Sequence, residues 1–269
     1  MSVLRPGFSE RVFEFSFNAE YAHRNRAILA GAPSIPTQNE EKSLGYDVMF
    51  ELKAGGGAVH TVALQHKVSR FVDKLGRSNG DFWKAAGGPY FAFRLDTDQY
   101  NLIQAISSMG TTGGEFQFCA PLFATRADMN THYMASSVEG NSIWIDVAGA
   151  GQISDGDTHT IVYRQDGTQA FRFSKSPTKL TVADNAARRA RWERRRAGKL
   201  EEPERIYSSA LKVLREYWPE RRQKAQRGSS DTGGGLPPKL PDEVAPTLVN
   251  AGRLLADYFG MSLLVEVRK

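Results

Sequence analysis

The sequence contains a single cysteine, Cys119, and no long run of apolar residues. One cysteine excludes an internal disulfide, and such low cysteine usage is typical of the reducing cytoplasm, where we expect the protein to reside. A membrane-spanning helix needs about 20 consecutive apolar residues, and the apolar runs here are only a few residues long. The first residues also lack an apolar segment followed by a small-residue cleavage site, so we expect no secretion signal.

Several catalytic motifs are also absent. None of the five histidines forms an H-E-x-x-H pattern, and there is neither a G-x-S-x-G motif nor a phosphate-binding loop of the G-x-x-x-x-G-K-S/T type. These absences argue against zinc proteases, serine hydrolases of the nucleophile-elbow type and P-loop nucleotide hydrolases. We also find no internal repeat.

The 269 residues have an ordinary globular composition, with 41% hydrophobic and 24% charged residues and a net charge of +5. The positive excess is concentrated in one segment. Residues 184–227 contain 14 basic and 7 acidic residues, so the rest of the chain is slightly acidic. The same segment is rich in Ala, Arg, Glu and Leu, which favour a helix.

This basic segment contains six closely spaced arginines. They are Arg188, Arg189, Arg191, Arg194, Arg195 and Arg196. One interpretation is a solvated helix face, because most charge runs only face water. A second is contact with the phosphates of a nucleic acid, which arginine binds without reading the sequence. A third is a protein interface, since Trp192, Tyr207 and Trp218 lie nearby.

The composition divides the chain into four segments. Residues 1–183 form the main body and 184–227 the basic helical segment. Residues 228–246, rich in glycine, serine and proline, read as a linker. Residues 247–269 predict a helix and an apolar strand that rejoins the main sheet.

Hydrophobic periodicity predicts helices and strands in mixed order within the main body. The expected helices are 9–31, 99–109 and 125–136, and the expected strands are 45–52, 59–72, 89–95, 115–123, 141–147, 159–164 and 169–174. This order favours an α/β fold, with α+β as the alternative, built on one mixed central sheet flanked by helices.

Two neighbouring strands carry the residues of greatest chemical interest. If 45–52 and 59–72 form a hairpin, Asp47, Gln65 and Lys67 project from one face at one end, because residues i and i+2 of a strand share a face. Asp47 could bind a divalent cation, Gln65 could add an amide oxygen, and Lys67 could stabilise charge on phosphorus. Glu20, in the first helix, could supply a second carboxylate. The simpler interpretation makes Asp47 a turn residue and Lys67 a solvated edge residue.

This constellation resembles the PD-(D/E)xK nuclease superfamily in its QxK variant, as found in prokaryotic restriction and phage defence. The resemblance rests on Asp47, Gln65 and Lys67, with Glu20 as a fourth position, and covers about the first 125 residues. It implies a restriction-endonuclease-like core with a basic helical insertion, and a catalytic site made of these four residues. Of these, Asp47, Glu20 and Gln65 would hold Mg²⁺, with Mn²⁺ as the alternative ion.

The implied function is that of an endonuclease, a hydrolase that cleaves double-stranded DNA, as an effector of antiphage defence. A regulatory protein partner or a homo-oligomer would restrain its activity. In the superfamily core a helix precedes three strands, with the acid on the second and the D/E/QxK motif on the third. No strand is predicted here between the first helix and 45–52, and Gln65 replaces the commoner acid. The alternative is therefore a non-catalytic subunit that keeps a nuclease-like fold and binds nucleic acid or a partner.

Overall fold

The structure is a computed structural model that describes residues 3–37, 45–53, 59–108 and 114–183. Its helices are α1 (Glu10–Arg24), α3 (Gly80–Ala86), α4 (Thr97–Ser108), α5 (Arg126–Met134) and the short 3-10 helix η2 (Ala148–Ala150). Its strands are β1 (Val3–Leu4), β2 (Val48–Lys53), β3 (Val59–His66), β4 (Arg70–Val72), β5 (Tyr90–Arg94), β6 (Gly114–Pro121), β7 (Ser142–Asp146), β8 (Thr160–Arg164), β9 (Ala170–Phe173) and β10 (Pro177–Val182).

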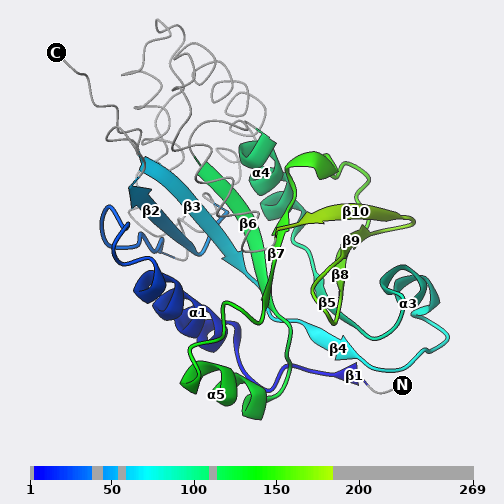
Figure 1. The fold of residues 1–269 in the computed structure, drawn as a ribbon. Coiled ribbons are helices and arrows are strands. Elements are labelled where there is room, and N and C mark those ends of the chain that lie inside the picture. Colours follow the sequence, from blue (N-terminus) through cyan, green and yellow to red (C-terminus); the bar gives the residue numbers. More distant parts are fainter. Residues whose placement is uncertain (1–2, 38–44, 54–58, 109–113, 184–269) are drawn as a thin grey trace, which may run out of the picture.

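All ten described strands belong to one sheet, in the order β1-β4-β5-β8-β9-β10-β7-β6-β3-β2 (Figure 1). Neighbouring strands are antiparallel except β3 and β6, which run parallel. The sheet is therefore mixed, and helices lie against it, which confirms the expected α/β architecture.

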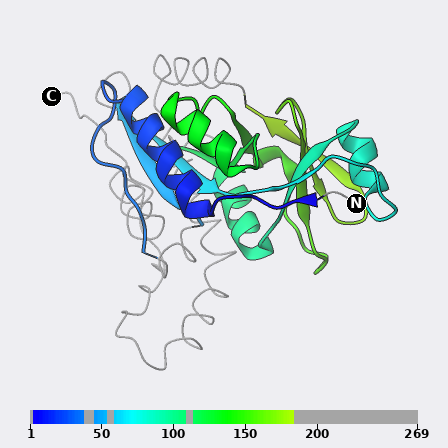
Figure 2. The same cartoon turned by 90° about the horizontal axis from the view of Figure 1, so that it is seen from below.

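The side chains of β2 and β3 alternate between two hydrophobic clusters. Val48 and Leu64 pack on the side of α1, whereas Met49 and Ala63 pack on the side of α4. This alternation follows from the two-residue period of a strand. Figure 2 shows α1 and α5 side by side on the first of these faces.

Helix α1 begins after Ser9, whose hydroxyl accepts a hydrogen bond from the backbone N–H of Val12. It ends at Arg24, so the expectation of a helix up to residue 31 was wrong. The chain turns at Asn25, and the segment that follows runs antiparallel to β2 along the edge opposite β3, with bridges Leu29↔Leu52 and Ser34↔Met49. Pairing with the edge of the sheet gives the backbone N–H and C=O groups of this segment their hydrogen-bond partners, which a longer helix would otherwise supply.

The expected single strand 59–72 is in fact two strands. β3 ends at His66 and pairs with β2 and β6, whereas β4 begins at Arg70 and pairs with β1 and β5. The chain thus passes from one half of the sheet to the other between these strands. Lys67 lies at the start of this passage, where its backbone N–H donates to the Cys119 carbonyl.

The basic segment 184–227, the linker 228–246 and the C-terminal helix and strand 247–269 lie outside the described residues. The proposed domain boundaries therefore stay predictions. Within the described part of the chain, no helix combines the length and the apolar character needed to cross a membrane.

Candidate functional site

Asp47 and Gln65 meet at one end of the β2–β3 hairpin. The register pairs Val48 with Leu64, so Asp47 lies directly opposite Gln65. The Gln65 side chain donates from Nε2 to Oδ1 of Asp47 at 2.8 Å. Both side chains are buried, with Gln65 only 1% exposed. Two of the residues that the sequence grouped together are therefore in direct contact.

The second oxygen of Asp47 is held by His66. The backbone N–H of His66 donates to Oδ2 at 2.6 Å, and Nδ1 of its ring lies 3.4 Å from the same oxygen. The ring is fully buried against Phe13 and Phe17 of α1. Burial acts to raise the pKa of Asp47, but His66 and the charge of Lys67 outweigh it, so the pKa lies below its ordinary value. Asp47 is therefore ionised at neutral pH.

Lys67 brings a positive charge to the same end of the hairpin. Its charge helps to lower the pKa of Asp47, which places it within electrostatic reach of that carboxylate. Its Nζ lies 3.7 Å from Oε1 of Glu10, and the other oxygen of Glu10 accepts the backbone N–H of Val68 at 3.3 Å. The Lys67 side chain remains 18% exposed.

Glu14 of α1 lies within electrostatic reach of this site, although the sequence did not identify it. Burial raises its pKa above the ordinary value, and the negative charge of Asp47 is the next largest cause. Helical spacing could have revealed it, because Glu10 and Glu14 continue the stripe formed by the buried Phe17 and Tyr21 along α1. Two carboxylates, Asp47 and Glu14, thus repel one another near Lys67.

Replacing Glu14 by glutamine is expected to stabilise the protein at pH 7. Because the pKa of Glu14 is raised in the folded state, its ionisation at neutral pH disfavours folding, and glutamine removes that cost. Glu14 is half-buried, so we expect Tm to rise by only about 1–2 °C. Thermal unfolding at pH 7 and pH 4 tests this, because the advantage disappears below the unfolded pKa. A Tm gain of equal size at both pH values would contradict it.

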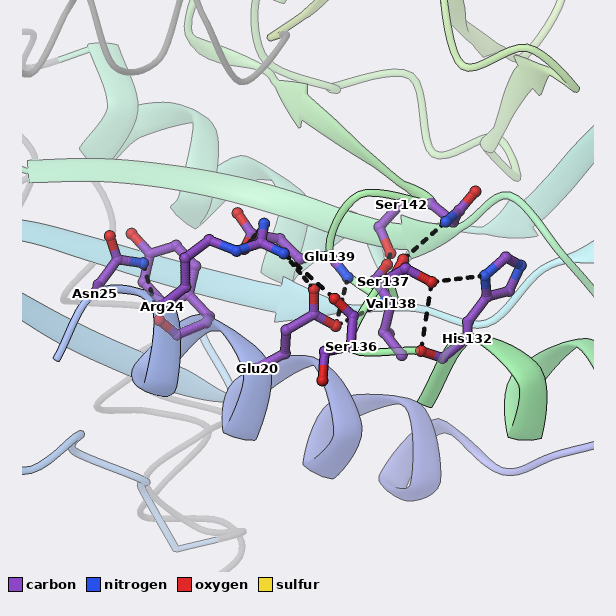
Figure 3. A network of polar contacts seen from close by, with 11 residues as sticks. Glu20, Arg24, Asn25, His132, Ser136, Ser137, Val138, Glu139 and Ser142 are labelled. Carbon is purple, nitrogen blue, oxygen red and sulfur yellow. Dashed lines mark hydrogen bonds and ion pairs between the residues drawn. The ribbon is translucent and has the colours of Figure 1, made fainter. Parts of the chain in front are cut away.

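The structure places Glu20 elsewhere. Its Oε1 accepts from Arg24 at 2.6 Å and its Oε2 accepts from the backbone N–H of Val138 at 2.6 Å (Figure 3). Arg24 also binds Glu139 at 2.7 Å. Helix rise separates Glu20 from Glu14 by about 9 Å along α1. The structure therefore does not bring Glu20 to Asp47, and Glu20 instead ties α1 to the loop between α5 and β7.

Removing the Glu20 carboxylate should destabilise the fold. The side chain is 7% exposed, and in Glu20→Ala the N–H of Val138 loses its acceptor while Arg24 loses one partner. We expect a loss of about 2 kcal/mol, which lowers Tm by about 4–8 °C. Urea unfolding measures this change, and Glu20→Gln, which keeps an acceptor oxygen, should lose about half as much. Equal stability of Glu20→Ala and the wild type would contradict the structural role.

The side chains at this end of the hairpin include the kinds of oxygen ligand that a hydrated magnesium ion uses. Such an ion needs only one or two carboxylates; Asp47 is one, and Glu14 lies within its electrostatic reach. The amide oxygen of Gln65 accepts from Gln99, so it does not face Asp47 in this structure. A cation would also offset the charge of Asp47, which adds to burial in raising the pKa of Glu14. Among the described residues, however, no three His, Cys, Asp or Glu side chains are grouped so that they could hold a metal ion by themselves.

The remaining candidate residues, the six arginines from Arg188 to Arg196, lie outside the described residues. Their contact with phosphate stays a prediction. Comparisons of the chain with family models, with curated proteins and with solved structures found no match.

Proposed function

We propose that the protein is a metal-dependent nuclease that hydrolyses phosphodiester bonds of DNA with Mg²⁺. One observation carries the proposal: the buried carboxylate of Asp47 is hydrogen-bonded to Gln65, and Lys67 follows two residues later within electrostatic reach. A carboxylate that can bind a divalent cation and an ammonium group that can stabilise charge on phosphorus are groups that promote phosphodiester hydrolysis.

The order of elements supports the same function. Helix α1 is followed by the segment Leu29–Ser34 that bridges to β2, then by β2, β3, α4 and β6, with β3 and β6 parallel. The superfamily core that the motif resembles has a helix and three strands, with the acid on the second and the QxK motif on the third. Here the bridging segment takes the place of the first strand, and β4, α3 and β5 are inserted between β3 and α4.

The residues have distinct roles in the proposed reaction. Asp47 and Glu14 would hold the ion, and Gln65 would add its amide oxygen. When bound, Mg²⁺ supplies positive charge that polarises a water and a phosphate oxygen. The ammonium group of Lys67 stabilises the negative charge that develops as the water oxygen bonds to phosphorus and the P–O bond to the leaving sugar oxygen breaks. The proton lost by the water balances the one gained by the leaving oxygen.

DNA as the substrate and antiphage defence as the setting are further parts of the proposal. They rest on the resemblance to restriction and defence nucleases and on the basic segment 184–227. A regulatory partner or a homo-oligomer would restrain the enzyme inside its host. If the arginines of this segment contact phosphates, neutralising them should weaken DNA binding and flatten its salt dependence.

Plasmid cleavage is the experiment that tests the function. Supercoiled plasmid incubated with the purified protein should be nicked or linearised in the presence of Mg²⁺ or Mn²⁺, and EDTA should stop the reaction. Circular dichroism on the same sample establishes that the protein is folded. Intact plasmid with both ions at millimolar concentration, in the presence of folded protein, would overturn the proposal.

A second candidate function is a non-catalytic subunit that binds nucleic acid or a partner protein on the same scaffold. It is favoured by the saturation of the site, since both oxygens of Asp47 and both ends of the Gln65 amide have protein partners. Calorimetry with Mn²⁺ separates the two functions. DNA binding without ion binding at millimolar Mn²⁺ would favour the subunit.

A further inference from the structure

The side-chain amide of Gln65 lies between two polar partners. Its Nε2 donates to Oδ1 of Asp47 at 2.8 Å, and its Oε1 accepts from Nε2 of Gln99 at 2.8 Å. Gln99 is half-buried in the first turn of α4, where its backbone N–H donates to Asp96. A continuous chain of hydrogen bonds therefore runs from α4 through Gln65 to the carboxylate of Asp47.

The carboxylate fixes the direction of this chain. An ionised carboxylate only accepts hydrogen bonds, so Gln65 must present its nitrogen to Asp47. The oxygen of Gln65, the one atom of its amide that can bind a cation, consequently faces Gln99. In this orientation Gln65 and Asp47 cannot offer oxygen atoms to the same ion. Half a turn of the Gln65 amide reverses the arrangement and brings its oxygen to the side of Asp47.

A turned Gln65 needs an acceptor for its nitrogen. The side chain is 1% exposed, and a buried N–H without a partner costs about 1–3 kcal/mol. Gln99 can meet this need, because a glutamine amide both donates and accepts. When Gln99 turns its own amide, its oxygen replaces its nitrogen opposite Gln65, so the buried nitrogen of Gln65 keeps an acceptor. Oδ1 of Asp47 then exchanges its hydrogen bond from Gln65 for the cation.

We propose that Gln99 is a positioning residue for the metal site, and that the amides of Gln65 and Gln99 turn together when a divalent cation binds at Asp47. Without the cation, the nitrogen of Gln65 donates to Asp47 and its oxygen accepts from Gln99. With the cation, the nitrogen of Gln65 donates to Gln99 and its oxygen faces the ion. This inference rests on the proposed function, because it requires an ion at Asp47.

The substitution Gln99→Glu tests the inference, because a carboxylate at position 99 can only accept. It favours the orientation in which Gln65 turns its nitrogen to residue 99 and its oxygen to Asp47. We expect Mn²⁺, measured by calorimetry, to bind about tenfold more tightly than to the wild type. The added negative charge also attracts the ion, so the same substitution is made in a Gln65→Met background, where no amide can turn. There the gain should be about threefold or less.

The outcomes separate the inference from the proposed function. An equal gain in both backgrounds, or no gain in the presence of Gln65, overturns the role of Gln99 and leaves a wild-type protein that still binds Mn²⁺. Failure of the wild type to bind Mn²⁺ at millimolar concentration overturns the proposed function, and the role of Gln99 with it.

A spectroscopic measurement decides the question if Gln65→Met prevents ion binding altogether. The side-chain ¹⁵N–¹H amide signals of Gln65 and Gln99 should shift together when the wild type is titrated with Mg²⁺. In Gln99→Glu, the Gln65 signal should already lie near its Mg²⁺-bound position before the ion is added. A Gln65 signal that shifts while the Gln99 signal stays fixed contradicts the concerted turn.

Discussion

Asp47→Asn is expected to lower the rate of Mg²⁺-dependent plasmid cleavage about a thousandfold. Asparagine preserves the size of the side chain but removes the negative charge. Asp47 is the most central of the acidic groups at this site, since it contacts both Gln65 and His66. Its lowered pKa means that the wild-type charge is fully present at neutral pH, so the substitution removes a full charge. Initial rates of plasmid nicking at saturating Mg²⁺ measure the effect.

A matched control distinguishes the loss of a negative charge at the site from the loss of a negative charge elsewhere on the protein. Asp166 is an exposed aspartate paired with Arg164 beside the β8–β9 turn, and it has no contact with the candidate site. Asp166→Asn should therefore cleave at the wild-type rate. Cleavage by Asp47→Asn within about threefold of the wild type would remove Asp47 from the chemistry.

Lys67→Met should lower the cleavage rate about a hundredfold while leaving Mn²⁺ affinity within about threefold of the wild type. Methionine keeps most of the apolar stem and removes the ammonium group, which in the proposed mechanism acts on the phosphate and not on the ion. Lys67 also helps to lower the pKa of Asp47, so its loss raises that pKa. The acidic limb of the pH–rate profile should consequently move to higher pH.

Two other variants serve as controls for Lys67→Met. Lys74→Met removes a lysine from the exposed loop before α3 and should leave the rate unchanged. Glu10→Gln weakens the ion pair that holds Lys67 at 3.7 Å and should keep most of the activity, because the ammonium group is still present. A hundredfold loss in Glu10→Gln together with full activity in Lys67→Met would reverse the assigned roles.

Part of the site could be predicted because strand geometry is simple. The two-residue period groups Gln65 with Lys67 only while the strand continues. β3 ends at His66, and Gln65 contacts Gln99 of α4 whereas Lys67 pairs with Glu10 of α1, so their common face is not confirmed. The pairing of Asp47 with Gln65 followed from one further assumption, that the two strands form a hairpin. Their register bears this out.

The rest depends on contacts between distant parts of the chain. Glu20 looked suitable because it is a helical acid, but only the packing of α1 brings Glu14 within electrostatic reach of Asp47 and lets Glu20 accept from Val138. Gln99 lies 34 residues beyond Gln65 in an ordinary helix turn, so no local pattern identifies it.

The same limit applies to the secondary structure. Helix α3 has seven residues, too few for hydrophobic periodicity to reveal it. Strand β10 begins at Pro177 and exposes three of its six residues, and it is held in the sheet by β7 and β9. A local pattern cannot anticipate such pairing, because the hydrogen bonds come from strands elsewhere in the chain.

Anomalous X-ray diffraction from crystals soaked in Mn²⁺ tests the metal site most directly. A catalytic ion requires a manganese peak in contact with the carboxylate of Asp47, with the oxygen of Gln65 turned toward it and Lys67 beside it. Crystals of Asp47→Asn grown and soaked in the same way should lack the peak. A peak elsewhere on the molecule, or none at millimolar Mn²⁺ in wild-type crystals, would contradict a metal-dependent nuclease built on these residues.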